Sequence, residues 1–264
     1  MALIELDRVA LRYGGEAGTL AVENCSLAVR PGEFAALVGP SGCGKSSLLK
    51  VVSGLHPIAS GTAKLHGAEI RGPTHGIGMA FQNATLLPWR STLDNVLLPL
   101  EVGRDTRRSF RRDRKRHVER AMRLLEVVGL AEFKDHAPWQ LSGGMQQRAS
   151  IARALSFDPQ LLLMDEPFGA LDEIVRDKLN AQLLRLWAET GKTVVFVTHS
   201  IPEAVYLSTR IVVMSPRPGR ITDVIESPLP RDRPLEIRDS KEFAEISHRV
   251  REGLRAGHAG HGDE

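Results

Sequence analysis

Residues 34–55 read FAALVGPSGCGKSSLLKVVSGL, and this stretch decides the fold of the chain. Its first five residues form an apolar run of the kind found in fully buried strands. The residues that follow, starting at Gly39, fit the pattern G-x-x-x-x-G-K-[ST] and lead directly into a helical sequence. A strand, a glycine-rich loop and a helix in this order predict a site for a phosphate group.

The loop combines a permissive backbone with a positive charge. Glycines let the backbone wrap closely around a phosphate, and the following helix presents its positive N-terminal end to the same anion. Lys45 supplies a point charge for the β- and γ-phosphates, and the hydroxyl of Ser46 is suited to bind Mg²⁺. A glycine-rich turn without a ligand is the alternative, which the flanking strand and helix disfavour. We expect a nucleotide to contact Gly39, Pro40, Ser41, Gly42, Cys43, Gly44, Lys45, Ser46 and Ser47.

A pair of carboxylates ends a second apolar run. The sequence LLLMDEP, residues 161–167, places Asp165 and Glu166 at the end of a predicted strand, where two adjacent carboxylates are costly without a function. Asp165 would hold Mg²⁺, directly or through water, and Glu166 would act as a general base toward an attacking water. A purely structural acidic pair is the alternative, and the phosphate loop elsewhere in the chain makes the catalytic interpretation the better one.

The composition is that of a soluble globular protein with a sizeable core. The 264 residues are 42% apolar and 25% charged, and the net charge of +3 is too small to indicate a nucleic-acid partner. Cys43 lies inside the glycine-rich loop, so we expect it and Cys25 to remain unpaired in a reducing compartment. The longest charge-free stretch, residues 72–89, is too polar to cross a bilayer, and the N-terminal residues do not resemble a signal peptide.

The remaining apolar runs predict the fold class. Val194–Val197 and Ile211–Met214 read as further buried strands, which together with the helical stretches between them indicate an α/β fold with a parallel sheet. Alternating patterns around residues 4–9, 20–29 and 62–70 predict antiparallel strands with one exposed face. We therefore expect an antiparallel β layer beside a parallel core.

Between the two halves of this core we expect an inserted helical subdomain, spanning about residues 83–157. Apolar residues at helical spacing predict two amphipathic helices, over residues 93–100 and 118–128. Between them lies a basic segment, Arg104–Arg116, with eight basic and two acidic residues. It is either a solvated helix start or loop, or a contact with anionic lipid headgroups or an acidic partner. Nucleic acid would require stacking aromatics, and the segment offers Phe110 alone.

The C-terminal residues read as an extension, residues 226–264. The proline-rich sequence after Arg217 predicts a segment extended over the surface, followed by a short helix over about residues 240–254. His258 and His261 near the end would be able to bind a metal, although a frayed polar terminus explains them as well.

One further motif connects these features to a family. Residues 141–148 read LSGGMQQR and open a predicted helix ahead of Asp165, and this octapeptide resembles the signature of ABC-transporter ATPases. The other positions of the family pattern appear in the same order over about residues 2–225. They are Tyr13, Gln82, Ala170-Leu171-Asp172 and His199. The resemblance implies a P-loop NTPase core with an antiparallel β layer and a helical subdomain, in a nucleotide-binding domain over residues 1–225.

The resemblance also implies a role for each of these residues. Tyr13 stacks on adenine, Gln82 reaches Mg²⁺ or the lytic water, and His199 contacts the γ-phosphate and the catalytic glutamate. Asp172 lies at the interface of a head-to-tail pair, in which each signature closes over the nucleotide of the other subunit. The residues that would bind the partner's nucleotide are Ser142, Gly143, Gly144 and Gln146.

A chain with one P-loop and no membrane span resembles a separate subunit of an importer. Residues 86–101 and 199–221 resemble the ATPases of nitrate, sulfonate and taurine importers and of thiamine-precursor importers, and Ser200-Ile-Pro favours the pyrimidine-precursor group. The implied ligands are ATP and Mg²⁺. The implied partners are a second copy, permease subunits and an extracytoplasmic solute-binding protein, at the cytoplasmic face of the membrane. A soluble ABC ATPase of DNA repair or translation is the alternative, and Glu166 argues against a binding module without turnover.

Four apolar residues directly after the Gln82 loop complete the candidates. Leu86, Leu87, Pro88 and Trp89 cannot continue into the next helix intact, because Pro88 breaks it. Either they are core residues, or they line a groove in which Trp89 anchors a short cytoplasmic helix of the permease.

Overall fold

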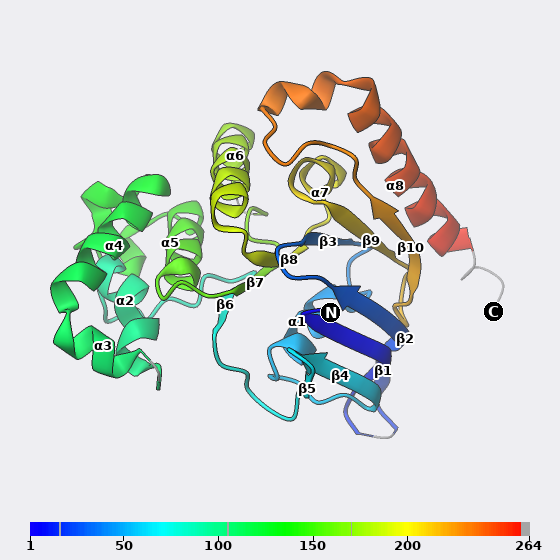
Figure 1. The fold of residues 1–264 in the computed structure, drawn as a ribbon, viewed down its shortest axis with the longest axis horizontal. Helices are drawn as coiled ribbons and strands as arrows, with labels where there is room; N and C mark the ends of the chain where they lie inside the picture. The colour runs from blue at the N-terminus through cyan, green and yellow to red at the C-terminus, as the bar shows by residue number, and fades with distance from the viewer. Residues whose placement is uncertain (16, 105, 170, 260–264) are drawn as a thin grey trace. The chain divides into compact units, whose positions relative to one another are not determined.

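The computed structural model describes residues 1–15, 17–104, 106–169 and 171–259, without the side chains of residues 258 and 259. The chain divides into two compact units (Figure 1): residues 1–75 with 183–264, and residues 76–182. One long helix, α6 (Glu173–Thr190), contains the division at residue 182. Of the residues named above, Asp105, Ala170, His261 and the side chain of His258 lie outside the described part of the chain.

The first unit contains the predicted antiparallel layer. Strand β1 (Ile4–Tyr13) pairs antiparallel with β2 (Thr19–Val29) on one side and with β4 (Ser60–Leu65) on the other, and β5 (Ala68–Glu69) pairs with β4. Along β1 most of the apolar side chains are buried and the charged ones are more exposed, as expected for a sheet with one solvated face. The prediction of an antiparallel layer is confirmed.

The parallel strands of the first unit position the phosphate loop. Strand β3 (Phe34–Val38) pairs in parallel with both β8 (Thr193–Val197) and β9 (Arg210–Met214), and every residue of the three strands is buried. Because parallel strands end at the same edge, the loops that follow β3 and β8 emerge there together. The loop after β3 leads into α1 (Lys45–Val52), and the turn after β8 leads into α7 (Ile201–Leu207).

The C-terminal region differs from the expectation in two ways. Part of the proline-rich segment forms β10 (Ile221–Glu226), which pairs antiparallel with β9, so the segment is not simply extended over the surface. After the short η3 (Leu235–Asp239), the final helix α8 (Lys241–Ala259) runs five residues past the predicted end at residue 254. The predicted boundary of the extension at residue 226 stays a prediction.

The length of α8 has a packing cause. Phe243, Ile246 and Val250 form a buried stripe along the helix. Beyond them, a Cβ atom at Gly253 would lie 3.4 Å from Val213 Cγ1, and one at Gly257 would lie 3.3 Å from Ser215 Cα. A Cβ atom at Gly253 would make an ordinary contact, whereas at Gly257 glycine lets the helix pass close to the backbone directly after β9, although glycine in a sequence favours a helix end.

The second unit combines two parallel strands with a helical layer. Strand β6 (Ile77–Ala80) pairs with β7 (Leu161–Asp165), and α5 (Gly143–Leu155) packs against β6 and against two other helices, α2 and α4. The two predicted amphipathic helices are confirmed, and the basic segment folds into α3 and the first turn of α4. The bounds of these three helices are Thr92–Val102 for α2, Arg107–Arg112 for α3 and Arg114–Val127 for α4. Two short 3₁₀ turns, η1 (Ala131–Phe133) and η2 (Pro138–Gln140), connect α4 to α5.

Within the described residues, no helix is both long enough and apolar enough to cross a membrane. Cys25 and Cys43 are both buried and unpaired, which agrees with the expectation that they form no disulfide. Burial raises the pKa of the Cys25 thiol to about 12, so this group stays protonated at neutral pH.

Candidate nucleotide site

The phosphate loop ends in a residue that has to be glycine. Gly44 adopts φ 98°, in the left-handed region, and caps the start of α1. A Cβ atom at this position would lie 2.4 Å from Val22 Cγ2 and 3.0 Å from Ala21 O. The loop therefore reaches the first turn of α1 by a path that only glycine permits, and the N–H groups of that turn face the loop.

The charge of Lys45 is held inside this loop. The side chain is 5% exposed, and Nζ donates hydrogen bonds to Gly39 O at 2.8 Å and to Pro40 O at 2.9 Å. Cys43 Sγ lies 3.7 Å from the same Nζ. A buried ammonium group beside a helix N-terminus is an arrangement suited to a polyanion.

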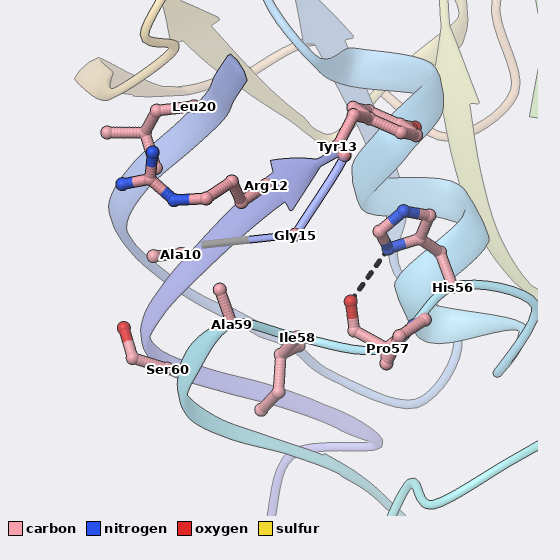
Figure 2. A pocket seen from close by; sticks show the side chains of 11 residues that line it. Ala10, Arg12, Tyr13, Gly15, Leu20, His56, Pro57, Ile58, Ala59 and Ser60 are labelled. Atoms are coloured by element: carbon pink, nitrogen blue, oxygen red, sulfur yellow. Dashed lines mark hydrogen bonds between the residues drawn. The ribbon is translucent and has the colours of Figure 1, made fainter. Parts of the chain in front are cut away.

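Tyr13 lies beside the loop, at the end of β1. Its hydroxyl is 2.9 Å from Ser47 Oγ, in the first turn of α1, and its ring meets the edge of the His56 ring with centroids 4.6 Å apart. Both rings line a pocket of about 680 Å³, together with Arg12, Pro57 and residues of the turn after β1 (Figure 2). Tyr13 is a residue that the sequence predicts for this site, whereas His56 belongs to no recognisable motif.

His199 lies in the first unit as well, directly after β8, and is exposed. The turn around it is closed by the side chain of Thr198, which donates to Glu203 Oε2 at 2.6 Å and accepts from Ser200 N at 3.0 Å. Ser200 in turn caps α7 by accepting from Glu203 N at 3.4 Å. Thr198 and Glu203 are both buried, so buried hydrogen bonds hold the turn that presents His199.

In the second unit, the acidic pair lies at the end of β7 as predicted. Asp165 is 6% exposed, whereas Glu166 is half-buried. The backbone of Glu166 adopts φ 45°, a conformation that residues other than glycine rarely take. A turn follows, in which Gly169 N donates to Glu166 O at 3.2 Å. Backbone strain of this kind is concentrated at functional sites, where the surrounding structure enforces it.

Asp172 follows this turn and is exposed. Its Oδ1 accepts a hydrogen bond from Val175 N at 2.9 Å, so the side chain caps the start of α6. The pKa of Arg148 is lowered because the group is partly buried, and the negative charge of Asp172 offsets part of this effect. Leu171, beside it, is buried.

The residues of the LSGG motif form the N-terminus of α5. Ser142 is the N-cap and accepts from Met145 N at 3.3 Å, so Gly143 and Gly144 form the first turn. Gln146 donates to Pro138 O at 3.0 Å and to Leu141 O at 3.2 Å, which fixes the preceding 3₁₀ turn. Ser142 and Gly143 are exposed, so this helix end is accessible from outside the subunit.

Gln82 is exposed and lies in a loop that is anchored on both sides. Gln147 of α5 donates to Phe81 O at 2.9 Å. Arg153, also of α5, donates to Ala84 O at 2.8 Å and to Thr85 O at 2.9 Å, and Thr85 adopts φ 45°. The sequence analysis did not identify Gln147 or Arg153 as residues of this site.

The next part of the same loop is held by Asn95 of α2. This buried side chain accepts from Leu87 N at 2.7 Å and donates to Leu87 O at 3.1 Å and to Ser91 O at 3.0 Å. Between these anchors Trp89 is 74% exposed, so it is not a core residue. A polar residue within the apolar stripe of a helix was the available sequence signal for Asn95.

With this geometry established, comparison with known proteins decides the family. A model of the family described as ABC transporter matches residues 22–169. The chain belongs to the ABC transporter family. It is therefore an ATPase, with the P-loop fold of that family.

Relatives of this ABC ATPase cover most of its length. An uncharacterized ABC transporter ATP-binding protein of Methanocaldococcus jannaschii is 45% identical, over 87% of this chain and 82% of its own. The taurine import ATP-binding protein TauB of Chromobacterium violaceum is 43% identical, over 95% of both chains. A solved dimeric ATP-binding cassette, in a post-hydrolysis state bound to ADP and Pi, superimposes with a TM-score of 0.71 at 32% identity and covers 84% of this chain and 98% of that structure.

Three residues are predicted from the sequence to bind Mg²⁺, and their assignment stays a prediction. Ser46, Gln82 and Asp165 offer a hydroxyl, an amide and a carboxylate oxygen, which are the hard ligands that Mg²⁺ prefers. Among the described residues, no cluster of three or more His, Cys, Asp or Glu side chains is arranged to hold a metal.

Proposed function

We propose that this chain is the ATP-hydrolysing subunit of an importer and works as a head-to-tail pair of identical subunits. The observation that carries the proposal is that one chain presents two anion-binding helix ends, α1 behind the P-loop and the exposed N-terminus of α5. It has a single set of residues for a nucleotide, so the second helix end is left for the nucleotide of a partner. The dimeric cassette that it resembles supports this arrangement.

Each residue has a chemical task in this arrangement. The P-loop amides and Lys45 bind the β- and γ-phosphates, and Tyr13 stacks on the base. Glu166 accepts a proton from the attacking water, and His199 contacts the γ-phosphate. Mg²⁺, held by Ser46, Asp165 and Gln82, would neutralise charge that develops on the phosphates. From the partner subunit, Ser142 and Gly143 close over the same γ-phosphate.

The transport side of the proposal rests on the relatives. Several of those that match more than four-fifths of this chain are named taurine import ATP-binding proteins. We infer that this chain drives a permease at the cytoplasmic face of the membrane, fed by an extracytoplasmic solute-binding protein. The solute belongs to the group of nitrate, sulfonates, taurine and thiamine or pyrimidine precursors.

The exposed Trp89 supplies the contact with the permease. Asn95 fixes the loop on both sides of this side chain, so an indole is presented to the outside on a rigid support. Large aromatic side chains of this kind are typical anchors of protein interfaces. A short cytoplasmic helix of the permease would pack against it, next to the loop of Gln82.

Reconstitution into proteoliposomes tests the proposal. The chain is combined with its permease and the solute-binding protein, and ATP hydrolysis is measured with each candidate solute in turn. We expect one solute of the group to stimulate hydrolysis and to accumulate inside, and the Glu166→Gln variant to do neither. Hydrolysis by the chain that is independent of any permease, together with ATP-dependent binding to ribosomes or DNA, would instead support the soluble class of ABC ATPase.

A further inference from the structure

The basic segment places seven exposed basic side chains on two consecutive helices of the second unit. They lie on α3 and on the first turn of α4, and we call them the basic surface: Arg107, Arg108, Arg111, Arg112, Arg114, Lys115 and Arg116. In the described part of the chain, no carboxylate lies within ion-pair distance of any of these seven groups. In Figure 1, α3 lies away from β6 and β7, at the outer end of the helical layer.

The fold keeps these like charges together. Phe110 is the buried side chain of α3, and Ser109 Oγ of the same helix lies 3.0 Å from His117 Nε2 of α4. The hydroxyl of Thr106 donates to Pro99 O at 3.1 Å and to Leu100 O at 3.0 Å, which ties the start of α3 to α2. Repulsion among exposed like charges opposes such an arrangement. Because these contacts hold the two helices in place despite that repulsion, the basic surface is part of the folded structure and not a loop.

The field of the surface extends to neighbouring groups. The pKa of Glu101 in α2 is lowered, first by its hydrogen bond with Arg90 and further by the charges of Arg114 and Arg107. The pair of Arg90 and Glu101 satisfies that carboxylate within α2 and the preceding loop. Asp113, the exposed carboxylate between the two helices, caps α4 by accepting from Arg116 N, so the segment keeps a large net positive charge for an external anion.

We propose that the basic surface binds the anionic lipid headgroups of the membrane in which the permease lies. The proposal rests on the proposed function, which brings the chain to a membrane. A specific protein interface would need a desolvated apolar or aromatic centre, and the aromatic residue of this segment, Phe110, is buried. Nucleic acid would need exposed aromatics for stacking, which the segment does not offer. Phosphate groups of lipids need only charge and guanidinium donors.

The size of the effect follows from the number of charges. Each basic side chain close to an anionic membrane surface strengthens binding by about five-fold at physiological salt. Neutralising the four arginines of α3 should therefore weaken binding at least about a hundred-fold. The remaining three basic groups on α4 would leave a weak residual attraction.

Co-sedimentation of the full-length chain with lipid vesicles tests the proposal. One set of vesicles is pure phosphatidylcholine, and the other contains about one third phosphatidylglycerol. We expect the chain to pellet with the anionic vesicles, to remain in solution with the neutral ones, and to dissociate as salt is raised. The variant Arg107→Gln, Arg108→Gln, Arg111→Gln and Arg112→Gln should lose this binding while it keeps its ATP hydrolysis rate.

A matched control separates the surface from net charge alone. It carries the same change at four exposed basic residues scattered over the chain: Arg30→Gln, Lys178→Gln, Arg185→Gln and Arg251→Gln. The affinity of the control for anionic vesicles should stay within a few-fold of that of the unaltered chain. Equal losses of vesicle binding in both variants would overturn the proposal. A failure of the unaltered chain to pellet with anionic vesicles would also overturn it.

A protein partner is the alternative occupant of the basic surface. If the unaltered chain does not bind vesicles and the α3 variant loses co-purification with detergent-solubilised permease, the surface belongs to a protein partner instead. Because ATP hydrolysis is measured separately, the proposed function can stand even where this proposal fails.

Discussion

The hydroxyl of Thr198 donates a hydrogen bond of 2.6 Å to the buried carboxylate of Glu203, and this bond closes the turn that presents His199. Thr198→Val removes the donor and leaves the side-chain volume almost unchanged. We expect kcat to fall about ten-fold or more with little change in KM for ATP, because a small displacement of a positioned group slows chemistry more than binding. Steady-state ATPase kinetics measure this, with Thr198→Ser as the control that restores the hydroxyl and the rate. A parallel loss of thermal stability in both variants would point to a structural role.

Replacement of Glu166 by glutamine tests the catalytic assignment. The amide keeps the shape of the side chain but cannot accept a proton at neutral pH, so turnover should fall by roughly 10²–10⁴-fold. Binding of ATP, measured by equilibrium dialysis, should remain intact. Lys45→Ala should show the opposite pattern, with weakened nucleotide binding, because it removes the charge held within the P-loop. Hydrolysis at a near-normal rate in the glutamine variant would show that the base is a different residue.

ATP should drive association of two chains. In the Glu166→Gln variant the nucleotide persists, so the pair that shares two nucleotides should accumulate when ATP and Mg²⁺ are added. Light scattering over a concentration series measures the change from monomer to dimer, and ADP serves as the control nucleotide. Ser142→Glu places a negative charge at the exposed N-cap of α5 and should abolish dimerisation without affecting binding of ATP to the P-loop. Monomers that persist with ATP bound would contradict shared sites.

Trp89→Ala should weaken the complex with the permease and spare the fold. The indole is 74% exposed, so its truncation should change the free energy of unfolding by less than about 0.5 kcal/mol. Co-purification with the permease should drop, and nucleotide binding by the isolated subunit should not. A variant that binds the permease normally would move the contact to another surface.

Asn95→Ala should destabilise the subunit strongly for a single polar substitution. The buried amide satisfies backbone groups at Leu87 and Ser91, and its removal leaves those groups without this partner. We expect a loss of about 2–3 kcal/mol in the free energy of unfolding, measured by urea denaturation. Asn95→Asp keeps the acceptor for Leu87 N but places a buried carboxylate against the carbonyl oxygens of Leu87 and Ser91, so it should lose at least as much. An unaffected stability in the alanine variant would mean that the loop is held by other contacts.

The sequence predicts the secondary structure of this protein where a run of apolar residues corresponds to a buried element. The strand Phe34–Val38 is wholly apolar, and the strand Leu161–Asp165 is apolar up to its final aspartate, so the position of both could be predicted from the chain alone. The end of α8 could not, because Gly257 reads as a helix end in the sequence, whereas in the fold it lies close to Ser215 directly after β9, which local patterns do not reveal.

In the candidate nucleotide site, too, local motifs could be predicted from the sequence and contacts between distant residues could not. The motifs at Gly39 and Leu141 are contiguous, so their residue types and spacing carry the prediction. Arg153 contacts Ala84 and Thr85, which are nearly seventy positions away in the chain, and a single arginine in a helix reads as a surface residue. Glu203 reads as an ordinary first-turn carboxylate, and its bond to Thr198 depends on how β8 meets α7.

The hydrogen bonds from Gln147 and Arg153 to the chain between Phe81 and Thr85 have a consequence for communication between subunits. They join the loop of Gln82 to the same helix, α5, that carries Ser142 at its end. A displacement imposed on the loop at Trp89 would thereby be passed to the N-terminus of α5, where Ser142 and Gly143 are exposed. In the head-to-tail pair that we propose, that helix end meets the ATP bound by the opposite chain, so the contact of one subunit with its permease would be sensed at the nucleotide of the other.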